Sequence, residues 1–181
     1  MSFNYSDLIA VSPILFLSAY SLLLLIIDAS LRKPANVVYW LTLLGLVVSG
    51  LLTVNTYNAS GIAFNGTVFT GRFPAFFEIV FLLSSALSVL LSKPYLEKQK
   101  INFGEYYSLV VFATVGMMLM ASARDLMVLF LGLELMSISL YVLAGFVRKD
   151  AKSNEASLKY FLLGAFATGF LLYGIALVYG A

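Results

Sequence analysis

Long apolar runs separated by short polar connections divide the chain from one end to the other. A helix needs about 20 mostly apolar residues to cross a hydrocarbon layer of about 30 Å. Segments of this kind occur at residues 8–28, 36–55, 73–92, 105–122, 125–147 and 155–179. The pattern therefore predicts an all-α membrane protein with six transmembrane helices.

The connections between these runs carry their own signals. Residues 122–125 are a very short break, which predicts that the fourth and fifth helices form a tight antiparallel pair. The longest connection, residues 56–72, alternates apolar and small polar residues around an Asn-Gly pair. It is expected to form a surface hairpin or a short interfacial segment.

The prolines fit this division. Proline lacks a backbone N–H, so it is tolerated at a helix start and in connections, and it kinks a helix interior. We therefore expect Pro34 and Pro94 in connections, Pro74 at a helix start, and Pro13 at a mild kink inside the first span.

Composition supports a membrane location. The 181 residues are 61% hydrophobic and only 11% charged, whereas soluble domains are about 45–50% apolar and about 25% charged. No Lys or Arg precedes the first apolar run, so that run reads as a membrane helix and not as a secretory signal peptide. The net charge of +2 gives no indication of nucleic-acid binding.

The absence of Cys and His from the sequence excludes several kinds of chemistry. A disulfide, a Cys-ligated iron–sulfur cluster and a His- or Cys-ligated haem or zinc site all need one of these residues. The usual Ser–His and Cys–His nucleophiles are excluded as well. Any redox chemistry linked to this chain must therefore take place in another subunit.

Basic residues are distributed unequally between the two sides. The connections after the first, third and fifth helices hold Arg32, Lys33, Lys93, Lys98, Lys100, Arg148, Lys149 and Lys152, whereas the other connections hold only Arg72 and Arg124. Cytoplasmic loops carry the excess of Lys and Arg. This asymmetry predicts that the three basic connections face the cytoplasm and that both termini lie on the opposite side.

Glu134 is the most conspicuous charge, because it falls near the middle of the fifth apolar run. A charge at the centre of a membrane helix costs about 2.5–3.5 kcal/mol on insertion scales. Ser137, Tyr141 and Gly145 follow at helical spacing and share its face, which should point into the bundle or toward a wet cavity. A buried carboxyl group can load and release a proton, and this suits Glu134 to a proton relay. The alternative is a neutral glutamic acid kept for packing alone.

Other charged residues have simpler readings. Lys159 lies about one turn inside the sixth helix if that helix starts near Glu155, where it either snorkels to the interface or takes part in a relay. Glu155 is expected as a first-turn anion, favoured by the helix dipole. Glu78 is expected near the outer end of the third helix, within reach of the headgroups, in a structural role.

Small residues and methionines are expected to serve packing. Gly164 with Thr168, and Ala165 with Gly169, have the spacing that permits close helix contact. The methionines of the "GMMLM" run in the fourth helix are expected to fill gaps in the bundle.

Two stretches also carry a family resemblance. "GEYYSLVVFATVGMMLMASARDLMVLFLGLELMSISLYVLAG" and "EASLKYFLLGAFATGFLLYGIALVYG" closely resemble the subunit N family of bacterial proton-pumping NADH–quinone oxidoreductase (respiratory complex I). That family is similar to the second membrane subunit of the mitochondrial complex and to antiporter subunits. Residues 1–103 resemble its three leading helices more loosely, chiefly in "FFEIVFLLSSALSVLLS".

The resemblance implies a fold of about fourteen helices with two inverted repeats, helices four to eight and nine to thirteen. Residues 1–103 would be three leading helices with an external hairpin-like loop, and residues 104–181 the first three helices of the first repeat. The chain stops at Ala181, so it reads as an N-terminal portion without the rest of that fold.

The resemblance also assigns roles. The Glu of "LELMS" falls on Glu134 and is taken as part of the proton path, and the Lys of "LKYFLLG" falls on Lys159. Ser137 and Tyr141 would support the same face. The complex would use NADH, FMN, iron–sulfur clusters and quinone in or near other subunits, with no cofactor in this chain. Its partners would be other membrane-arm subunits and the lipid bilayer, in the bacterial inner membrane. The alternative is a six-helix structural or assembly protein without transport of its own.

Overall fold

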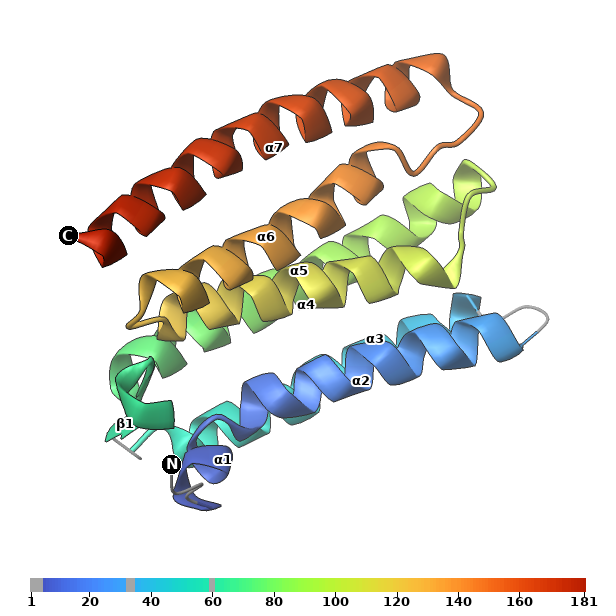
Figure 1. Cartoon of the computed structure of the whole chain (residues 1–181). Coiled ribbons are helices and arrows are strands. Elements are labelled where there is room, and N and C mark those ends of the chain that lie inside the picture. Colours follow the sequence, from blue (N-terminus) through green and yellow to red (C-terminus); the bar gives the residue numbers. More distant parts are fainter. Residues whose placement is uncertain (1–4, 32–34, 59–60) are drawn as a thin grey trace.

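The computed structural model describes residues 5–31, 35–58 and 61–181. Figure 1 shows long helices running side by side, with a small hairpin at one end of the bundle. The helices are α1 (Tyr5–Ala10), α2 (Ser12–Ser30), α3 (Ala35–Thr56), α4 (Arg72–Lys98), α5 (Gly104–Ser122), α6 (Leu126–Ala144) and α7 (Ala151–Gly180). All of them except α1 are long and apolar enough to cross a membrane, which confirms the six expected spans.

The first span differs from the single kinked helix that was expected. The chain breaks at Val11, where α1 ends and α2 begins, so Pro13 lies in the first turn of α2. Proline is well tolerated there because the first helical N–H groups have no partner within the helix. The predicted kink is therefore a boundary between two helices.

Pro94 lies inside α4 and not in a connection, so that expectation was wrong. Proline removes one helical hydrogen bond, but neighbouring contacts hold the last turn against the bundle. Leu96 is buried, and the Lys93 ammonium lies 4.3 Å from the centre of the Tyr39 ring. Pro34 lies outside the described residues.

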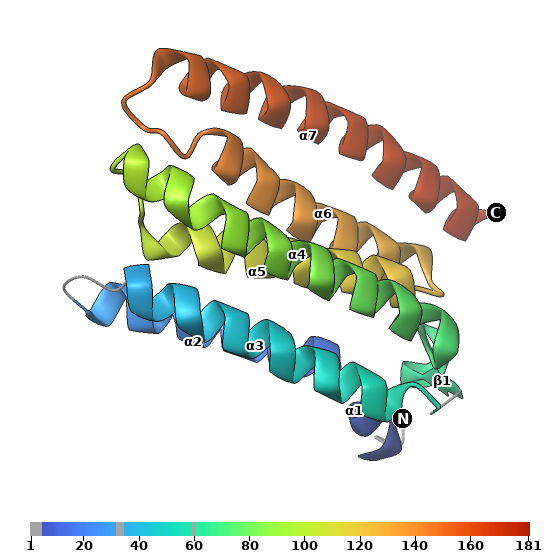
Figure 2. The same cartoon turned by 180° about the vertical axis from the view of Figure 1, so that it is seen from behind.

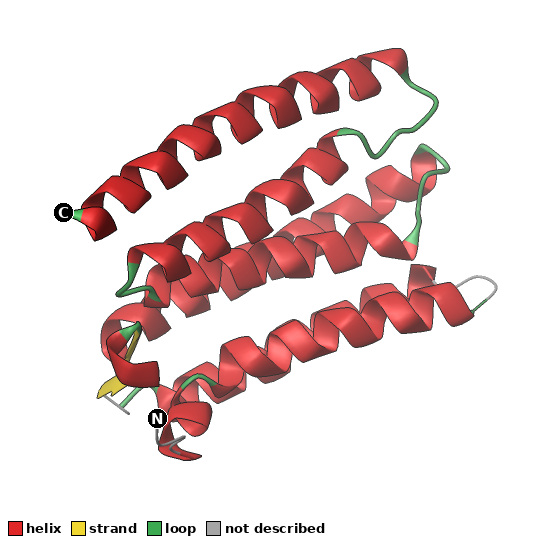
Figure 3. Ribbon diagram, in the orientation of Figure 1, coloured by secondary structure: helices red, strands yellow, loops and turns green. Residues whose placement is uncertain are grey.

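The connection between α3 and α4 forms the expected hairpin. Strands β1 (Gly61–Ala63) and β2 (Val68–Thr70) pair antiparallel, and Ala63 faces Val68 in the register. Asn65 and Gly66 between them have positive φ angles, which suits the Asn-Gly pair. The hairpin packs against the bundle, because Ala63 and Val68 are both buried. Figure 3 shows it beneath the ends of the helices.

Helix α5 lies at the centre of the bundle, and α7 lies at its edge. Half of the most apolar stretch of α5 is buried, compared with 6% of the corresponding stretch of α7. Figure 2 shows α7 lying outside α6, on the far side of the molecule from α2 and α3. The apolar core therefore lies among α2, α3, α4 and α5. As expected, Met118 of the methionine run is fully buried in it.

The two ends of the bundle differ in chemistry. The α4–α5 and α6–α7 connections lie side by side, because the rings of Phe103 and Tyr106 both contact Phe146. Lys98, Lys100 and Lys149 belong to this end. The opposite end carries α1, the hairpin, the α5–α6 turn and the end of α7, as Figure 1 shows. Two of the three connections predicted to share one side, α4–α5 and α6–α7, therefore do so, whereas Arg32 and Lys33 of the third lie outside the described residues.

Candidate functional site

Helix α6 places Glu134 midway between its two ends. The helix begins after Asp125, whose side chain accepts a hydrogen bond from the Met127 N–H and caps the first turn. Ser137 and Tyr141 lie on the same face as Glu134, as the spacing predicted, and both are buried. The polar face of α6 therefore points into protein at Ser137 and Tyr141.

The Glu134 side chain is only partly exposed. In the described part of the chain, its Oε1 atom is buried and has no hydrogen-bond partner. A buried carboxylate oxygen is costly to ionise without a donor, and the described residues offer none to Oε1.

Helix α7 covers the Tyr141 end of this face. The Tyr141 ring makes edge contacts with Tyr160 and Phe161, with ring centres 4.8 and 5.7 Å apart. Gly164 leaves room for it, because a Cβ there would collide with the Tyr141 hydroxyl. The small residue at 164 thus serves close packing as expected, whereas a Cβ at Gly169 would meet nothing within 4 Å.

Lys159 lies on the exposed surface of α7, ion-paired with Glu155 one turn earlier. Among the described hydrogen bonds and ion pairs, none joins Lys159 to Glu134. The helix starts at Ala151 and not near Glu155, so Lys159 lies about 12 Å along it, deeper than expected. Glu155 is therefore no first-turn anion, and Asp150 caps the helix instead, accepting from the Lys152 N–H.

The back of α6 is fixed against α5. A Cβ on Gly116 would come within 2.6 Å of the Gly132 carbonyl oxygen, so the two backbones touch at this crossing. Gly132 lies two residues before Glu134. The contact therefore sets the height of the carboxyl group in the bundle, and it confirms the tight pairing of these two helices.

Glu78 differs most from its sequence-based reading. It does not reach the headgroup layer: the residue is only 6% exposed, and its carboxyl group points between helices. The Thr53 and Ser122 hydroxyls lie within hydrogen-bond distance of its two oxygens. A signal was present in the sequence, since Ser85 and Ser92 follow Glu78 at intervals of seven and continue a polar stripe on one helix face.

Comparisons with known proteins agree with the fold. A family model described as "NADH:quinone oxidoreductase/Mrp antiporter, TM" matches residues 123–181. NADH-quinone oxidoreductase subunit N of Trichlorobacter lovleyi is 49% identical over 98% of this chain and 37% of its own length. The subunit N of Salinibacter ruber is 43% identical over 97% of this chain and 35% of its own length.

Solved structures give the same result. A chain of respiratory complex I from Thermus thermophilus matches with a TM-score of 0.79 and 35% identity, over 93% of this chain and 36% of that one. A chain of an archaeal membrane-bound sulfane sulfur reductase matches with a TM-score of 0.77, over 97% of this chain and 37% of that one. At 21% identity the second likeness shows the fold alone.

The chain spans little more than a third of the length of the curated relatives it matches. Within that length the alignment covers nearly every residue of this chain, the leading helices included. The family expected from the sequence is thereby confirmed. By sequence and by fold, the chain is homologous to NADH-quinone oxidoreductase subunit N.

Proposed function

We propose that this chain acts in the membrane arm of an NADH–quinone oxidoreductase that moves protons across the membrane, and that Glu134 binds and releases those protons. The homology to subunit N supports the first part of this proposal. The second part rests on the position and surroundings of one side chain.

The observation that carries the proposal is the Oε1 of Glu134, midway along α6, which has no hydrogen-bond partner among the residues that the structure describes. A carboxyl group kept only for packing would be expected to have its oxygens satisfied by fixed donors. An unsatisfied acceptor at mid-membrane depth is instead suited to taking up a proton or a water molecule. The Gly116–Gly132 contact on the other side of α6 keeps this group at a constant height.

Electron transfer is assigned to other subunits. The sequence has no Cys and no His, so partner subunits would hold the iron–sulfur clusters. The family resemblance assigns NADH, FMN and quinone to other subunits as well, or to sites near them. This chain would contribute a protonatable group to a path that redox events elsewhere drive. The complex would lie in the bacterial inner membrane, with the basic connections in the cytoplasm.

Lys159 is not assigned to the proton relay. Its exposed ion pair with Glu155 supports a role at the surface of α7 and not a direct exchange of protons with Glu134. Exposed pairs at this spacing contribute about 0.3–0.5 kcal/mol to helix stability. We therefore place the proton relay of this chain on Glu134.

The test replaces Glu134 by Gln in the subunit that carries this chain, within its assembled complex. Glu97→Gln is a matched control, because Glu97 is an exposed glutamate of α4. NADH-driven proton uptake by inverted membrane vesicles should fall several-fold with Glu134→Gln and stay unchanged with Glu97→Gln. The amount of subunit in the membrane should be equal in both. Equal proton uptake in the two variants would contradict the assignment and favour a structural role.

A further inference from the structure

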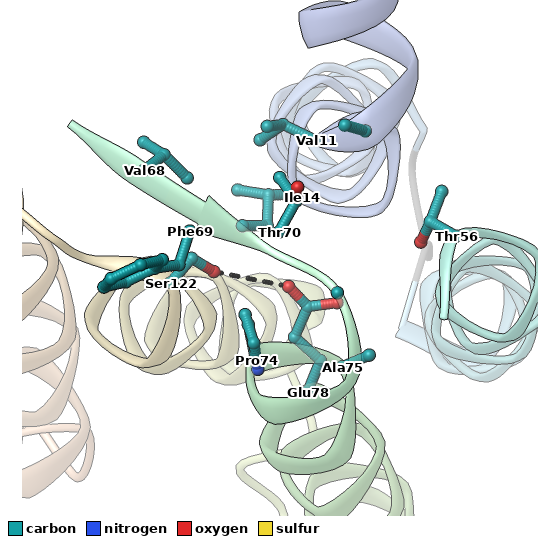
Figure 4. Close-up of a pocket in the computed structure, with 12 residues that line it drawn as sticks. Val11, Ile14, Thr56, Val68, Phe69, Thr70, Pro74, Ala75, Glu78 and Ser122 are labelled. Atoms are coloured by element: carbon teal, nitrogen blue, oxygen red, sulfur yellow. Dashed lines mark hydrogen bonds between the residues drawn. The ribbon is translucent and has the colours of Figure 1, made fainter. Parts of the chain in front are cut away.

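A second buried carboxyl group lies at the hairpin end of the bundle, in no contact with the α6 site. Glu78 of α4 lies between Thr53 of α3 and Ser122 of α5, as Figure 4 shows in part. The Thr53 Oγ1 is 3.1 Å from Glu78 Oε2, and the Ser122 Oγ is 3.4 Å from Glu78 Oε1. Two helices besides its own thus supply its polar surroundings.

The Thr53 and Ser122 hydroxyls do little to stabilise a negative charge on Glu78. Each hydroxyl has one proton to donate. Ser122 Oγ lies closer to the Met118 carbonyl oxygen, at 2.8 Å, than to Glu78. Thr53 Oγ1 is equally far, 3.1 Å, from Glu78 and from the Ser49 carbonyl oxygen. When a hydroxyl donates to its helix carbonyl, only its lone pairs face Glu78, and the carboxyl group itself must supply the proton of that hydrogen bond.

The charged groups around Glu78 leave it without a counter-ion among the described residues. Arg72, on its own helix, is exposed. Arg124, at the α5–α6 turn, points away, since its guanidinium reaches the Gly66 carbonyl oxygen and lies over the Phe69 ring. Asp7 of α1 accepts the Phe64 N–H. A buried carboxylate without a cation is costly, so the neutral acid is the form that fits.

Water can reach this group. A small cavity beside Glu78 offers about 10 Å³ to the centre of a water molecule, close to what one ordered water needs. Its lining comes from the end of α1, the start of α2, the end of α3, strand β2, the first turns of α4 and the end of α5, and it includes Thr56 and Thr70. Among the described residues of that lining, Glu78 is the one ionisable side chain. The cavity lies under the hairpin, at the end of the bundle opposite the basic connections.

From these observations we infer that Glu78 is a proton-binding site, which exchanges its proton with water through the cavity beneath the β1–β2 hairpin. The described residues form no cluster of three or more His, Cys, Asp or Glu side chains that would hold a divalent metal ion, and the experiment below separates a proton from sodium. The site is separate from Glu134 and does not depend on the function proposed for it.

Infrared spectroscopy of the full chain in lipid vesicles tests this inference. A protonated carboxylic acid has a carbonyl stretching band that an ionised carboxylate lacks. At neutral pH, the infrared spectrum of the unmodified chain minus that of Glu78→Gln should contain this band. The band should also appear when the same subtraction is made with Glu134→Gln present in both chains. Absence of the band from both difference spectra, or its loss on adding sodium at constant pH, would overturn the inference.

Two further variants test the neighbours and the route. Thr53→Val keeps Glu78 but removes one partner, so the band should move to higher frequency; an unmoved band would count against the site. It also serves if Glu78→Gln fails to fold. Thr70→Trp adds a large ring to the lining of the cavity, whereas Ile62→Trp adds the same ring to the exposed face of β1. After transfer to D₂O, the exchange of the Glu78 proton for deuterium shifts the band. This exchange should be several-fold slower in Thr70→Trp than in the unmodified chain, and unchanged in Ile62→Trp. Equal rates would refute the cavity route.

Discussion

Gly116 of α5 and Gly132 of α6 lie back to back, each with its Cα hydrogens against the other's backbone. A Cβ on Gly132 would come within 2.8 Å of the Gly116 carbonyl oxygen, and one on Gly116 within 2.6 Å of the Gly132 carbonyl oxygen. Backbone atoms cannot move aside as a flexible side chain can. The crossing of these two helices therefore requires glycine at both positions.

Gly116→Ala should destabilise the chain by separating α5 from α6. Overpacking of this kind costs about 1–3 kcal/mol. Gly50→Ala is the matched control, because a Cβ at Gly50 of α3 would meet nothing within 4 Å, and alanine is the better helix former. Unfolding of the full chain in mixed micelles with a denaturing detergent should show a lower midpoint for Gly116→Ala and an unchanged or higher one for Gly50→Ala. A reversed order would disprove the close contact.

The packing of α7 onto α6 can be tested by cross-linking. A Cβ on Gly145 would lie 2.9 Å from the Ser157 Cβ, which is shorter than the about 3.5–4.5 Å that a disulfide spans, so a small outward shift of α7 would bring the pair into range. The natural sequence has no cysteine, so Gly145→Cys with Ser157→Cys should form one intramolecular disulfide on mild oxidation. Adding Gly164→Val should reduce its yield by displacing Tyr141, whereas Gly169→Val should not. Equal yields with both valines would contradict the Gly164–Tyr141 contact.

Low pH should weaken the hairpin end of α6. The Tyr179 hydroxyl donates to the Asp125 carboxylate at 2.6 Å and the Met127 N–H donates at 2.8 Å. These bonds, that of Tyr179 above all, lower the pKa of Asp125 below its ordinary value. Because the folded pKa is the lower one, this stability is present above the unfolded pKa, about 3.9, and is lost as the pH falls through the folded value. The midpoint temperature of thermal unfolding of the unmodified chain should therefore decrease as the pH is lowered below about 4.

Asp125→Asn removes the titrating group and supplies the control. Its midpoint should depend less on pH across the same acid range, and Tyr179→Phe should reduce the dependence by a smaller amount. Parallel curves for all three chains would show that Asp125 does not contribute to the acid sensitivity.

Thiol labelling tests the orientation of the bundle. Single cysteines at Asn58, Gln99 and Ala151 would be the only thiols in the chain, and all three positions are exposed. In intact cells an impermeant reagent should label Asn58→Cys and leave the other two unlabelled until the membrane is opened. The opposite labelling pattern would mean that the bundle has the inverted orientation in the membrane. Labelling of Gln99→Cys and Ala151→Cys from different sides would mean that α5 and α6 do not both span the membrane.

The sequence predicted the helices well because each must supply about 20 apolar residues, whatever it packs against. The face shared by Ser137 and Tyr141 followed from helical spacing alone. The extension of α4 past Pro94 could not be predicted, because it depends on tertiary contacts such as the Lys93 ammonium over the Tyr39 ring. Propensity is a weak guide where such contacts stabilise a strained turn.

The candidate site was predicted less completely. Glu134 stood out because it interrupts an apolar run, but the burial of Glu78 depends on α3 and α5, which supply Thr53 and Ser122 from positions 25 and 44 residues away. The contact between Gly116 and Gly132 could not be predicted from the sequence either. Contacts of this kind arise only when the helices assemble, so their partners cannot be identified from one segment.

The most direct test of the central claim measures protons moved per electron in the assembled complex carrying Glu134→Gln. Proton uptake and NADH oxidation are followed together in the same inverted vesicles, so that slower turnover alone does not change the ratio. If Glu134 carries protons, the ratio should fall below that of the unmodified complex, and Glu134→Asp should restore part of it. An unchanged ratio at normal turnover would contradict the account and leave Glu134 as a packing residue of α6.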